Sequence, residues 1–144
     1  MSGRKGDGVA SPLRVPIAGE DDIVAARQHA RALAQALGFR AIDQSRITTA
    51  VSELARNVVR YATDGRGEVL LRPLAAATGG AGIEIIVRDE GPGIANVDLA
   101  LREGYTSGRG LGMGLPGTRR LMDEMVIDSV AGHGTTVTIR KWRR

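Results

Sequence analysis

Two kinds of residue are scarce in this sequence, and each absence narrows what the protein can do. Because there is no cysteine among its 144 residues, disulfides, thiolate metal sites and thiol nucleophiles are excluded, in keeping with a reducing cytoplasm. Aromatic residues make up 3% of the chain, too few for the stacking surfaces that bind single-stranded nucleic acid. No stretch reaches the roughly 18 apolar residues of a membrane span, and the N-terminus lacks a signal-peptide apolar region. We therefore expect a cytoplasmic protein that binds neither nucleic acid nor membrane.

Basic charge is in excess but is concentrated at the two ends of the chain. The formal net charge is +4, and residues 140–144 alone carry +4, while residues 4–7 add +1. Residues 8–139 therefore sum to −1. The sequence predicts a flexible leader at 1–12, a single domain over 13–144, and a solvated basic C-terminal tail rather than a basic face.

The first third of the chain predicts one strand followed by two helices. Residues 13–17 alternate apolar with polar residues and contain Pro16, which is typical of an edge strand. Apolar residues at steps of three and four then predict a helix that begins in the acidic turn at 20–22 and stops at Gly38. A second helix is predicted to be capped by Asp43 and to end before Gly65.

The rest of the chain predicts two strand pairs separated by a glycine-rich segment and a short helix. Residues 68–74 and 83–88 are rich in β-branched residues and are predicted to be joined by a long loose loop at 75–82. A short helix is predicted to start near Pro116 and to run through Met122 and Met125, with strands at 126–130 and 135–142. This order favours an α+β fold, a mixed and mostly antiparallel sheet covered on one face by helices.

Glu53 and Asn57 form the first candidate pair for chemistry. They lie four residues apart on the second predicted helix, away from its apolar stripe, so their side chains share one face. A carboxylate can take a proton from a hydroxyl, and an Asn carbonyl suits Mg²⁺, which needs few protein ligands when phosphates supply the others. The pair alone is equally compatible with a solvated helix surface.

The segment 89–94, Asp-Glu-Gly-Pro-Gly-Ile, follows directly on a predicted strand. Its glycines allow a ligand to approach the backbone, and Asp89 can accept a hydrogen bond from an exocyclic amine such as that of adenine. A polar turn without a ligand is the alternative.

The second glycine-rich segment is the stronger signal, since six glycines fall within residues 104–117. Alternate glycines can present successive N–H groups to an anion, and the helix that follows offers its positive end to the same anion. Phosphate is the expected ligand, and the segment is expected to order as a lid when a nucleotide binds. It is neither a P-loop nor a dinucleotide fingerprint, because no Gly-Lys-Ser/Thr follows and no strand directly precedes it. A loop without a ligand is the alternative.

Taken in order, these segments and the Gly134-Thr135-Thr136 turn resemble the motifs of the GHKL ATPase superfamily over about residues 13–142. The closest likeness is to the small bacterial serine/threonine kinases of the anti-sigma and switch-kinase type, and residues 108–124 are most similar to the RsbT-type branch. This resemblance implies the ATP-binding α+β sandwich of that superfamily, with ATP and Mg²⁺ as cofactors.

The resemblance also assigns roles to individual residues. Glu53 is implied as the general base and Asn57 as the Mg²⁺ ligand, while Arg109 is implied to neutralise the γ-phosphate. Asp89 is implied to bind the adenine amine, with Thr136 supporting it from a strand. The further nucleotide-binding residues implied are Gly91, Gly93, Gly108, Gly110, Leu111, Gly112, Met113 and Gly114.

The implied function is a kinase of a bacterial partner-switching stress module. Such a kinase phosphorylates a STAS-domain regulator and is then able to bind and activate a PP2C-type phosphatase. Two alternatives stay open: an anti-sigma factor kinase that binds a sigma factor directly, and a non-catalytic ATP-binding docking module.

Overall fold

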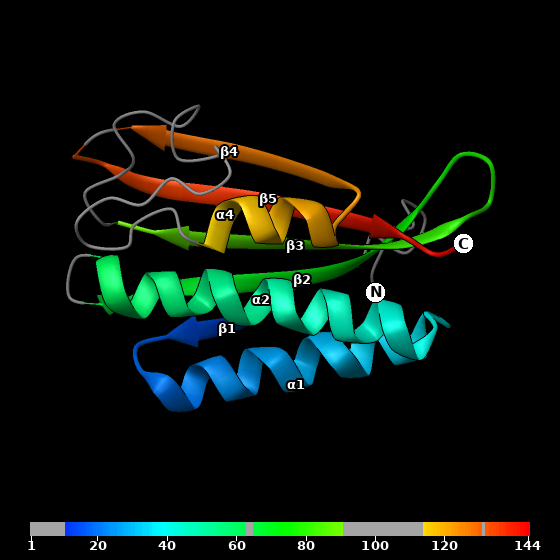
Figure 1. Ribbon diagram of the computed structural model, residues 1–144, viewed down its shortest axis with the longest axis horizontal. Coiled ribbons are helices and arrows are strands. Elements are labelled where there is room, and N and C mark those ends of the chain that lie inside the picture. Colours follow the sequence, from blue (N-terminus) through cyan, green and yellow to red (C-terminus); the bar gives the residue numbers. More distant parts are fainter. Residues whose placement is uncertain (1–10, 63–64, 91–113, 131) are drawn as a thin grey trace, which may run out of the picture.

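The protein forms one antiparallel sheet with helices packed against one of its faces (Figure 1). The computed structural model describes residues 11–62, 65–90, 114–130 and 132–144. The predicted α+β class and the single helical layer are confirmed, and every strand pair in the described residues is antiparallel rather than mixed. The predicted leader at 1–12 lies almost wholly outside the described residues.

The sheet follows the order β1-β2-β3-β5-β4. Its strands are β1 (Leu13–Ile17), β2 (Gly67–Ala75), β3 (Ala81–Asp89), β4 (Glu124–Val130) and β5 (Gly134–Trp142). β1 lies at one edge and pairs with β2, with Pro16 opposite Glu68. The edge position predicted from Pro16 is therefore confirmed, because an edge strand has one side on which a missing N–H costs nothing.

Three helices, α1 (Glu20–Ala36), α2 (Ala41–Tyr61) and α4 (Gly114–Leu121), cover one face of the sheet in the described residues (Figure 1). Alternate strand residues such as Val69, Ile85 and Ile139 are buried beneath them. α1 buries Ala26, Ala30 and Ala34, whose small side chains let it lie close beside α2. None of the described helices is long and apolar enough to cross a membrane.

The start of α2 and the β2–β3 hairpin differ from prediction. α2 begins at Ala41 with Arg40 as its N-cap, and Asp43 forms ion pairs with Arg40 and Arg46 instead of capping the helix. The predicted loop at 75–82 is shorter than expected, because the β2–β3 ladder continues to Ala75 opposite Ala81 and leaves residues 76–80 as a hydrogen-bonded turn.

The short helix after the glycine-rich segment is also shorter than predicted. α4 ends at Leu121, and the predicted helical residue Met125 lies in β4, paired opposite Ile139. The change occurs where the Asp123 N–H donates to the carbonyl of Arg140 in β5. Pairing with β5 therefore outweighs the helical spacing of the methionines, which is a case of tertiary contacts overriding local pattern.

The predicted C-terminal tail is in large part not a tail. Arg140 and Lys141 belong to β5, and Lys141 is buried. Arg140 forms ion pairs with Glu84 and Glu124, and Arg144 pairs with Asp123. The prediction of a solvated tail was wrong because these cations have carboxylate partners that are distant in sequence.

Candidate active site

A polar row interrupts the helix-facing side of the sheet at one end. The register places Gly67 opposite Asp89, Asp89 opposite Thr135, and Thr135 opposite Ser129. The next row inward is Val69, Val87, Val137 and Ile127, which is apolar throughout. Because side chains alternate between faces along a strand, Asp89, Thr135 and Ser129 project toward the helices. The Ser129 and Thr135 hydroxyl oxygens lie 3.0 Å apart.

α2 passes directly over this polar row. A Cβ atom added to Gly67 would lie 2.9 Å from Cγ1 of Val58, so α2 crosses the row at Val58. Asn57 is the residue before Val58, and Glu53 lies one helical turn earlier. The two helical candidates and Asp89 are therefore gathered at one end of the molecule.

Gly134 ties the last motif to the Asp89 segment. Its φ of +99° favours glycine, and a Cβ atom there would lie 2.2 Å from the Asp89 carbonyl oxygen. No other residue fits this close approach without moving the backbone. The glycine thus fixes the end of β3, from which Asp89 projects, against the start of β5.

Glu53 is partly exposed and is held by its neighbour. Nη1 of Arg56 donates to Oε1 of Glu53 at 2.8 Å, and 41% of the Glu53 side chain is exposed. An ion pair of this exposure contributes little stability, about 0.3–0.5 kcal/mol. Its effect is on geometry, because it fixes the carboxylate on the surface of α2 and leaves Oε2 available to a hydroxyl from solvent or from a bound protein.

The end of α4 is fastened to the sheet by a buried lysine. Nζ of Lys141 donates to the Leu121 carbonyl at 2.9 Å and lies 3.9 Å from Asp43 and 4.0 Å from Asp123. Burial of Asp123 acts to raise its pKa, but hydrogen bonds from Trp142 and Arg144 and the charge of Lys141 outweigh it and lower the pKa. α4 is thereby set against α2, and its first residue, Gly114, stands where the glycine-rich segment ends.

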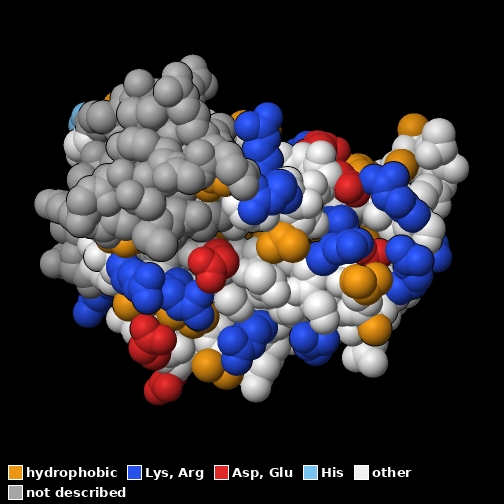
Figure 2. All heavy atoms as spheres, viewed as in Figure 1, with side chains coloured by type: hydrophobic (Ala, Val, Ile, Leu, Met, Phe, Trp, Pro, Cys, Tyr) orange, Lys and Arg blue, Asp and Glu red, His pale blue; other side chains and the backbone are white. Residues whose placement is uncertain are grey.

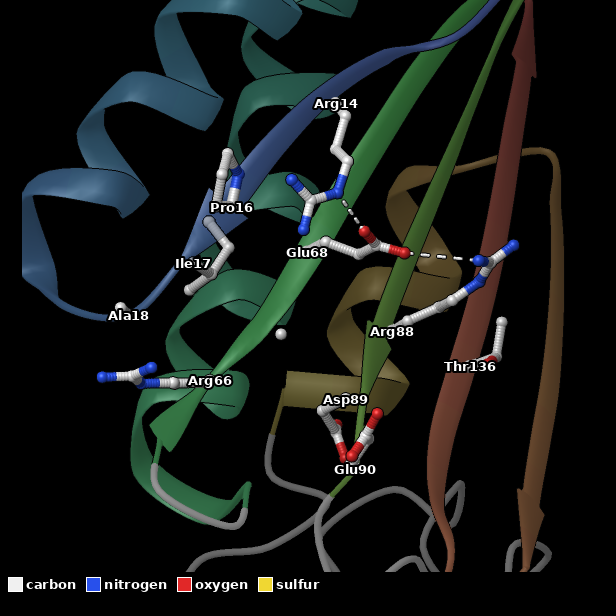
Figure 3. A pocket seen from close by; sticks show the side chains of 11 residues that line it. Arg14, Pro16, Ile17, Ala18, Arg66, Glu68, Arg88, Asp89, Glu90 and Thr136 are labelled. Atoms are coloured by element: carbon white, nitrogen blue, oxygen red, sulfur yellow. Dashed lines mark hydrogen bonds and ion pairs between the residues drawn. The ribbon is translucent and has the colours of Figure 1, made fainter.

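A cavity of about 650 Å³ lies on the opposite face at the same end of the sheet, and its lining includes Gly67 and Asp89 of the polar row. Arg14 and Arg88 extend from either side toward Glu68, and both form ion pairs with it (Figure 3). Thr136 also lines this cavity. The two arginines of this cavity already share a carboxylate partner. The polar row offers an acid and two hydroxyls, and α2 above it offers the Asn57 amide, a set of donors and acceptors that suits a nucleotide better.

The structure brings together three of the predicted site residues and separates a fourth from them. Glu53, Asn57 and Asp89 lie at the end of the sheet crossed by α2. Thr136 projects from the other face, opposite Arg88, whereas Thr135 is paired with Asp89; Thr136 and Asp89 nevertheless line the same cavity. The remaining predicted residues other than Gly114 lie outside the described residues: Gly91, Gly93, Gly108, Arg109, Gly110, Leu111, Gly112 and Met113.

Thr135, Ser129 and Gly67 also belong to the polar row, although none of them was predicted as a site residue. The position of Thr135 could have been predicted from the sequence, because it alternates with the apolar residues Val137 and Ile139 and therefore lies on the same face of the strand. Ser129 follows in the same way from Ile127. Gly67 alternates with Val69 and Leu71 in the same way, but the need for glycine there could not be predicted, because it depends on α2 passing above this residue.

Most of the chain matches a known protein family. The family model described as "Histidine kinase-like ATPase domain" matches residues 18–141, which include every residue of the polar row together with Glu53 and Asn57. This chain belongs to that family. The predicted recognition is confirmed.

Among curated relatives of this family member is the serine/threonine-protein kinase RsbT of Bacillus subtilis, which is 49% identical over 130 residues, 90% of this chain and 96% of the relative. The anti-sigma F factor of Geobacillus thermodenitrificans is 36% identical over 69% of this chain and 70% of the relative. A solved structure of the RsbU and RsbW domains of a Mycobacterium tuberculosis protein matches 94% of this chain and 34% of that one, with a TM-score of 0.60 and 22% identity. The mycobacterial sensor histidine kinase MprB matches 92% of this chain with a TM-score of 0.55. These structures agree with the fold.

Proposed function

We propose that this histidine kinase-like ATPase domain is a protein serine/threonine kinase that transfers the γ-phosphoryl group of ATP to a STAS-domain regulator. The observation that carries the proposal is Glu53, a partly exposed carboxylate on α2 beside the polar row. The kinase RsbT, at 49% identity over nearly its full length, supports this assignment above that of an anti-sigma factor, since the anti-sigma F factor of Geobacillus thermodenitrificans is 36% identical over 69% of the chain.

The residues present fit a nucleotide with its metal ion. Asp89 accepts a hydrogen bond from the adenine amine, and Thr135, hydrogen-bonded to Ser129, supports the base from the next strand. The amide oxygen of Asn57 is a suitable ligand for Mg²⁺, which prefers one or two protein oxygens and takes others from phosphates. When bound, Mg²⁺ neutralises phosphate charge. Gly114 and the glycines before it supply backbone N–H groups for the same phosphates.

Glu53 acts on the acceptor. Its Oε2 accepts the proton of a Ser or Thr hydroxyl, the hydroxyl oxygen bonds to the γ-phosphorus, and the bond to the bridging oxygen breaks to leave ADP. Arg56 is a positioning residue, because it holds Oε1 and so orients the carboxylate. Arg109, outside the described residues, is assigned to neutralise charge on the transferred group.

The wider role proposed is partner switching in the cytoplasm, in which the kinase, once its STAS-domain substrate is phosphorylated, binds and activates a PP2C-type phosphatase. The presence of RsbT and anti-sigma F factors among the relatives supports a regulatory role of this kind.

The deciding experiment incubates the protein with Mg²⁺-ATP and a STAS-domain protein from the same organism, and reads the intact mass of that STAS-domain protein. We expect one added phosphate with the natural chain. Glu53→Gln keeps the size of the side chain but removes the base, so transfer should fall by about 10²–10⁴-fold, while ATP affinity stays within twofold. Glu20→Gln, which removes an exposed acid at the start of α1, is the matched control.

Two outcomes would contradict the proposal. Undiminished transfer by the Glu53→Gln variant would remove Glu53 from the role of base. Absence of phosphate in the presence of measurable ATP binding and a stable complex would indicate a docking module.

A further inference from the structure

The helical face carries a positive charge that the distribution along the sequence conceals. Counting its N-cap Arg40, α2 has four arginines and two acids, and α4 has two arginines and no acid, so together they carry +4. α1 adds three acids and two arginines, with its acids confined to the first turn. Figure 2, which looks onto the helices, shows Lys and Arg side chains spread across this face. The expectation that the basic charge forms no face was therefore wrong.

Two arginines of α2 stand symmetrically about Glu53. Arg46, Glu53 and Arg60 are spaced by seven residues, so they follow one line along the helix with about 10 Å between neighbours and a drift of about 20° per step. The Arg46 side chain is 44% exposed and Arg60 is exposed. A proposed base is thus flanked on both sides by outward-facing guanidinium groups.

These cations are only partly neutralised. Asp43, itself buried, is shared by Arg40, Arg46 and Lys141. Within the described ranges no carboxylate lies within 4.0 Å of the guanidinium of Arg60 or of Arg119, which is exposed near the end of α4. Solvated arginines without an acid partner are available to an acidic surface of another protein, for which they provide bidentate donors.

From this arrangement we propose that the line Arg46–Glu53–Arg60 of α2, together with Arg119 on the neighbouring helix α4, is a docking surface for an acidic patch that surrounds the acceptor hydroxyl of the substrate protein. The inference rests on the proposed function, because it places the phosphorylated protein over Glu53. Complementary charge steers association and fixes orientation. Because Arg46 and Arg60 lie on opposite sides of Glu53, an acidic patch that contacts both would be oriented along α2, with the acceptor hydroxyl over Glu53.

The test measures steady-state phosphorylation of the same STAS-domain protein by three variants of the kinase: Arg60→Glu, Arg119→Glu and the double variant. We expect KM for the protein substrate to rise about tenfold for each single variant, with kcat and KM for Mg²⁺-ATP within twofold, and the salt dependence of kcat/KM to weaken. A lysine placed at an acidic position of the substrate should restore the affinity of Arg60→Glu.

Arg143→Glu is the matched control. It makes the same change in net charge at an exposed arginine beside Gly38, and the helix from Ala41 to Glu53 separates that turn from the base by about 18 Å. We expect its KM values to equal those of the natural chain. Circular dichroism and thermal unfolding of each variant confirm that it is folded.

Outcomes separate this inference from the function on which it rests. Unchanged KM for the protein substrate in the double variant, with transfer intact, overturns the docking surface and leaves the kinase. A rise in KM for Mg²⁺-ATP instead overturns it by assigning the arginines to the nucleotide. If no phosphate is transferred, binding of the STAS-domain protein is measured by calorimetry. Affinity that is lost in Arg60→Glu supports the docking surface although the kinase proposal has failed. Affinity that is unchanged in the variant, or no binding to the natural chain, overturns both proposals.

Discussion

The two faces of this molecule differ in how completely their arginines are paired with carboxylates. The strands place four arginines and four acids on the open sheet face, so their formal charges sum to zero: Arg14, Arg72, Arg88 and Arg140 with Glu68, Glu84, Glu124 and Asp128. All four of these arginines form ion pairs. On the helical face Arg60 and Arg119 have no carboxylate within 4.0 Å in the described part of the chain.

This difference shows where charge contributes to the fold and where it is left for a partner. Glu84 is 2% exposed, and both of its oxygens are occupied, one by Arg72 at 2.6 Å and one by Arg140 at 2.8 Å. Such a carboxylate must be paired, because an isolated buried charge is costly. On the helical face the buried Asp43 is paired in the same way, by Arg40, Arg46 and Lys141. Arg60 and Arg119, in contrast, are exposed, and their charge is available for recognition.

The largest expected effect comes from breaking the junction that fixes the end of β3 beneath the helical face. Gly134→Ala adds a Cβ atom 2.2 Å from the Asp89 carbonyl oxygen at a φ of +99°. Crowding and backbone strain together should lower the free energy of unfolding by about 3–5 kcal/mol, and ATP affinity should fall as Asp89 moves. Urea unfolding and nucleotide binding measure both quantities.

Gly132→Ala is the control for that junction, because Gly132 also has a positive φ, +83°, but has nothing within 4 Å of its added Cβ atom. Backbone strain alone should cost about 1–2 kcal/mol, with ATP affinity unchanged. Equal losses in the two variants would show that the contact with Asp89 does not matter.

The open face is tested next, through Glu84. Burial acts to raise the pKa of Glu84, but hydrogen bonds from Arg72 and Arg140 and their charges outweigh it, so its pKa lies below the ordinary value. A carboxyl group with a lowered folded-state pKa stabilises the protein above its unfolded-state pKa of about 4.3 and loses that contribution as the pH falls through the folded-state pKa. Glu84→Gln should therefore cost about 2 kcal/mol at pH 7, the value of a hydrogen bond to a charged group.

The pH dependence distinguishes this ion pair from simple loss of packing. The stability difference between the natural chain and Glu84→Gln should be constant above about pH 5 and shrink below about pH 4. Asp128→Asn is the control on the same face, since no cation lies within 4.0 Å of Asp128 in the described residues, and it should change stability by at most about 0.5 kcal/mol. A difference for Glu84→Gln that does not vary with pH would refute the ion-pair explanation.

Local patterns in the sequence were sufficient to predict most of the fold. Pro16 predicted an edge strand, and period-two and period-3.6 spacing predicted the sheet and the helical layer, because burial imposes those periods directly. The end of α4 was not predictable in this way. The helix ends at Leu121 because the Lys141 side chain binds the Leu121 carbonyl and because the residues that follow pair with β5. These contacts join residues up to 20 positions apart in the sequence.

The candidate site could be predicted from the sequence only where its residues are close together in the chain. Glu53 and Asn57 lie on one turn of one helix, and Asp89 ends one strand, so sequence spacing was enough to select them. The charged helical face was hidden, because a sum along the chain averages Arg60 and Arg119 with acids that the fold places on the opposite side of the sheet. Segregation of charge by face requires knowledge of which elements lie side by side.

The smallest expected effect compares the two faces at adjacent residues. Thr135 lies opposite Asp89 on the helical side, whereas Thr136 lies opposite Arg88 on the open side. If the nucleotide binds beneath α2, Thr135→Ala should weaken ATP binding about five- to tenfold, the value of one hydrogen bond, and Thr136→Ala should stay within twofold. Isothermal titration with Mg²⁺-ATP measures both variants. A loss confined to Thr136→Ala would instead place the nucleotide in the cavity of the open face, and since that cavity is lined by Arg14, Glu68 and Arg88, the assignment of Glu53 as base would fail with it.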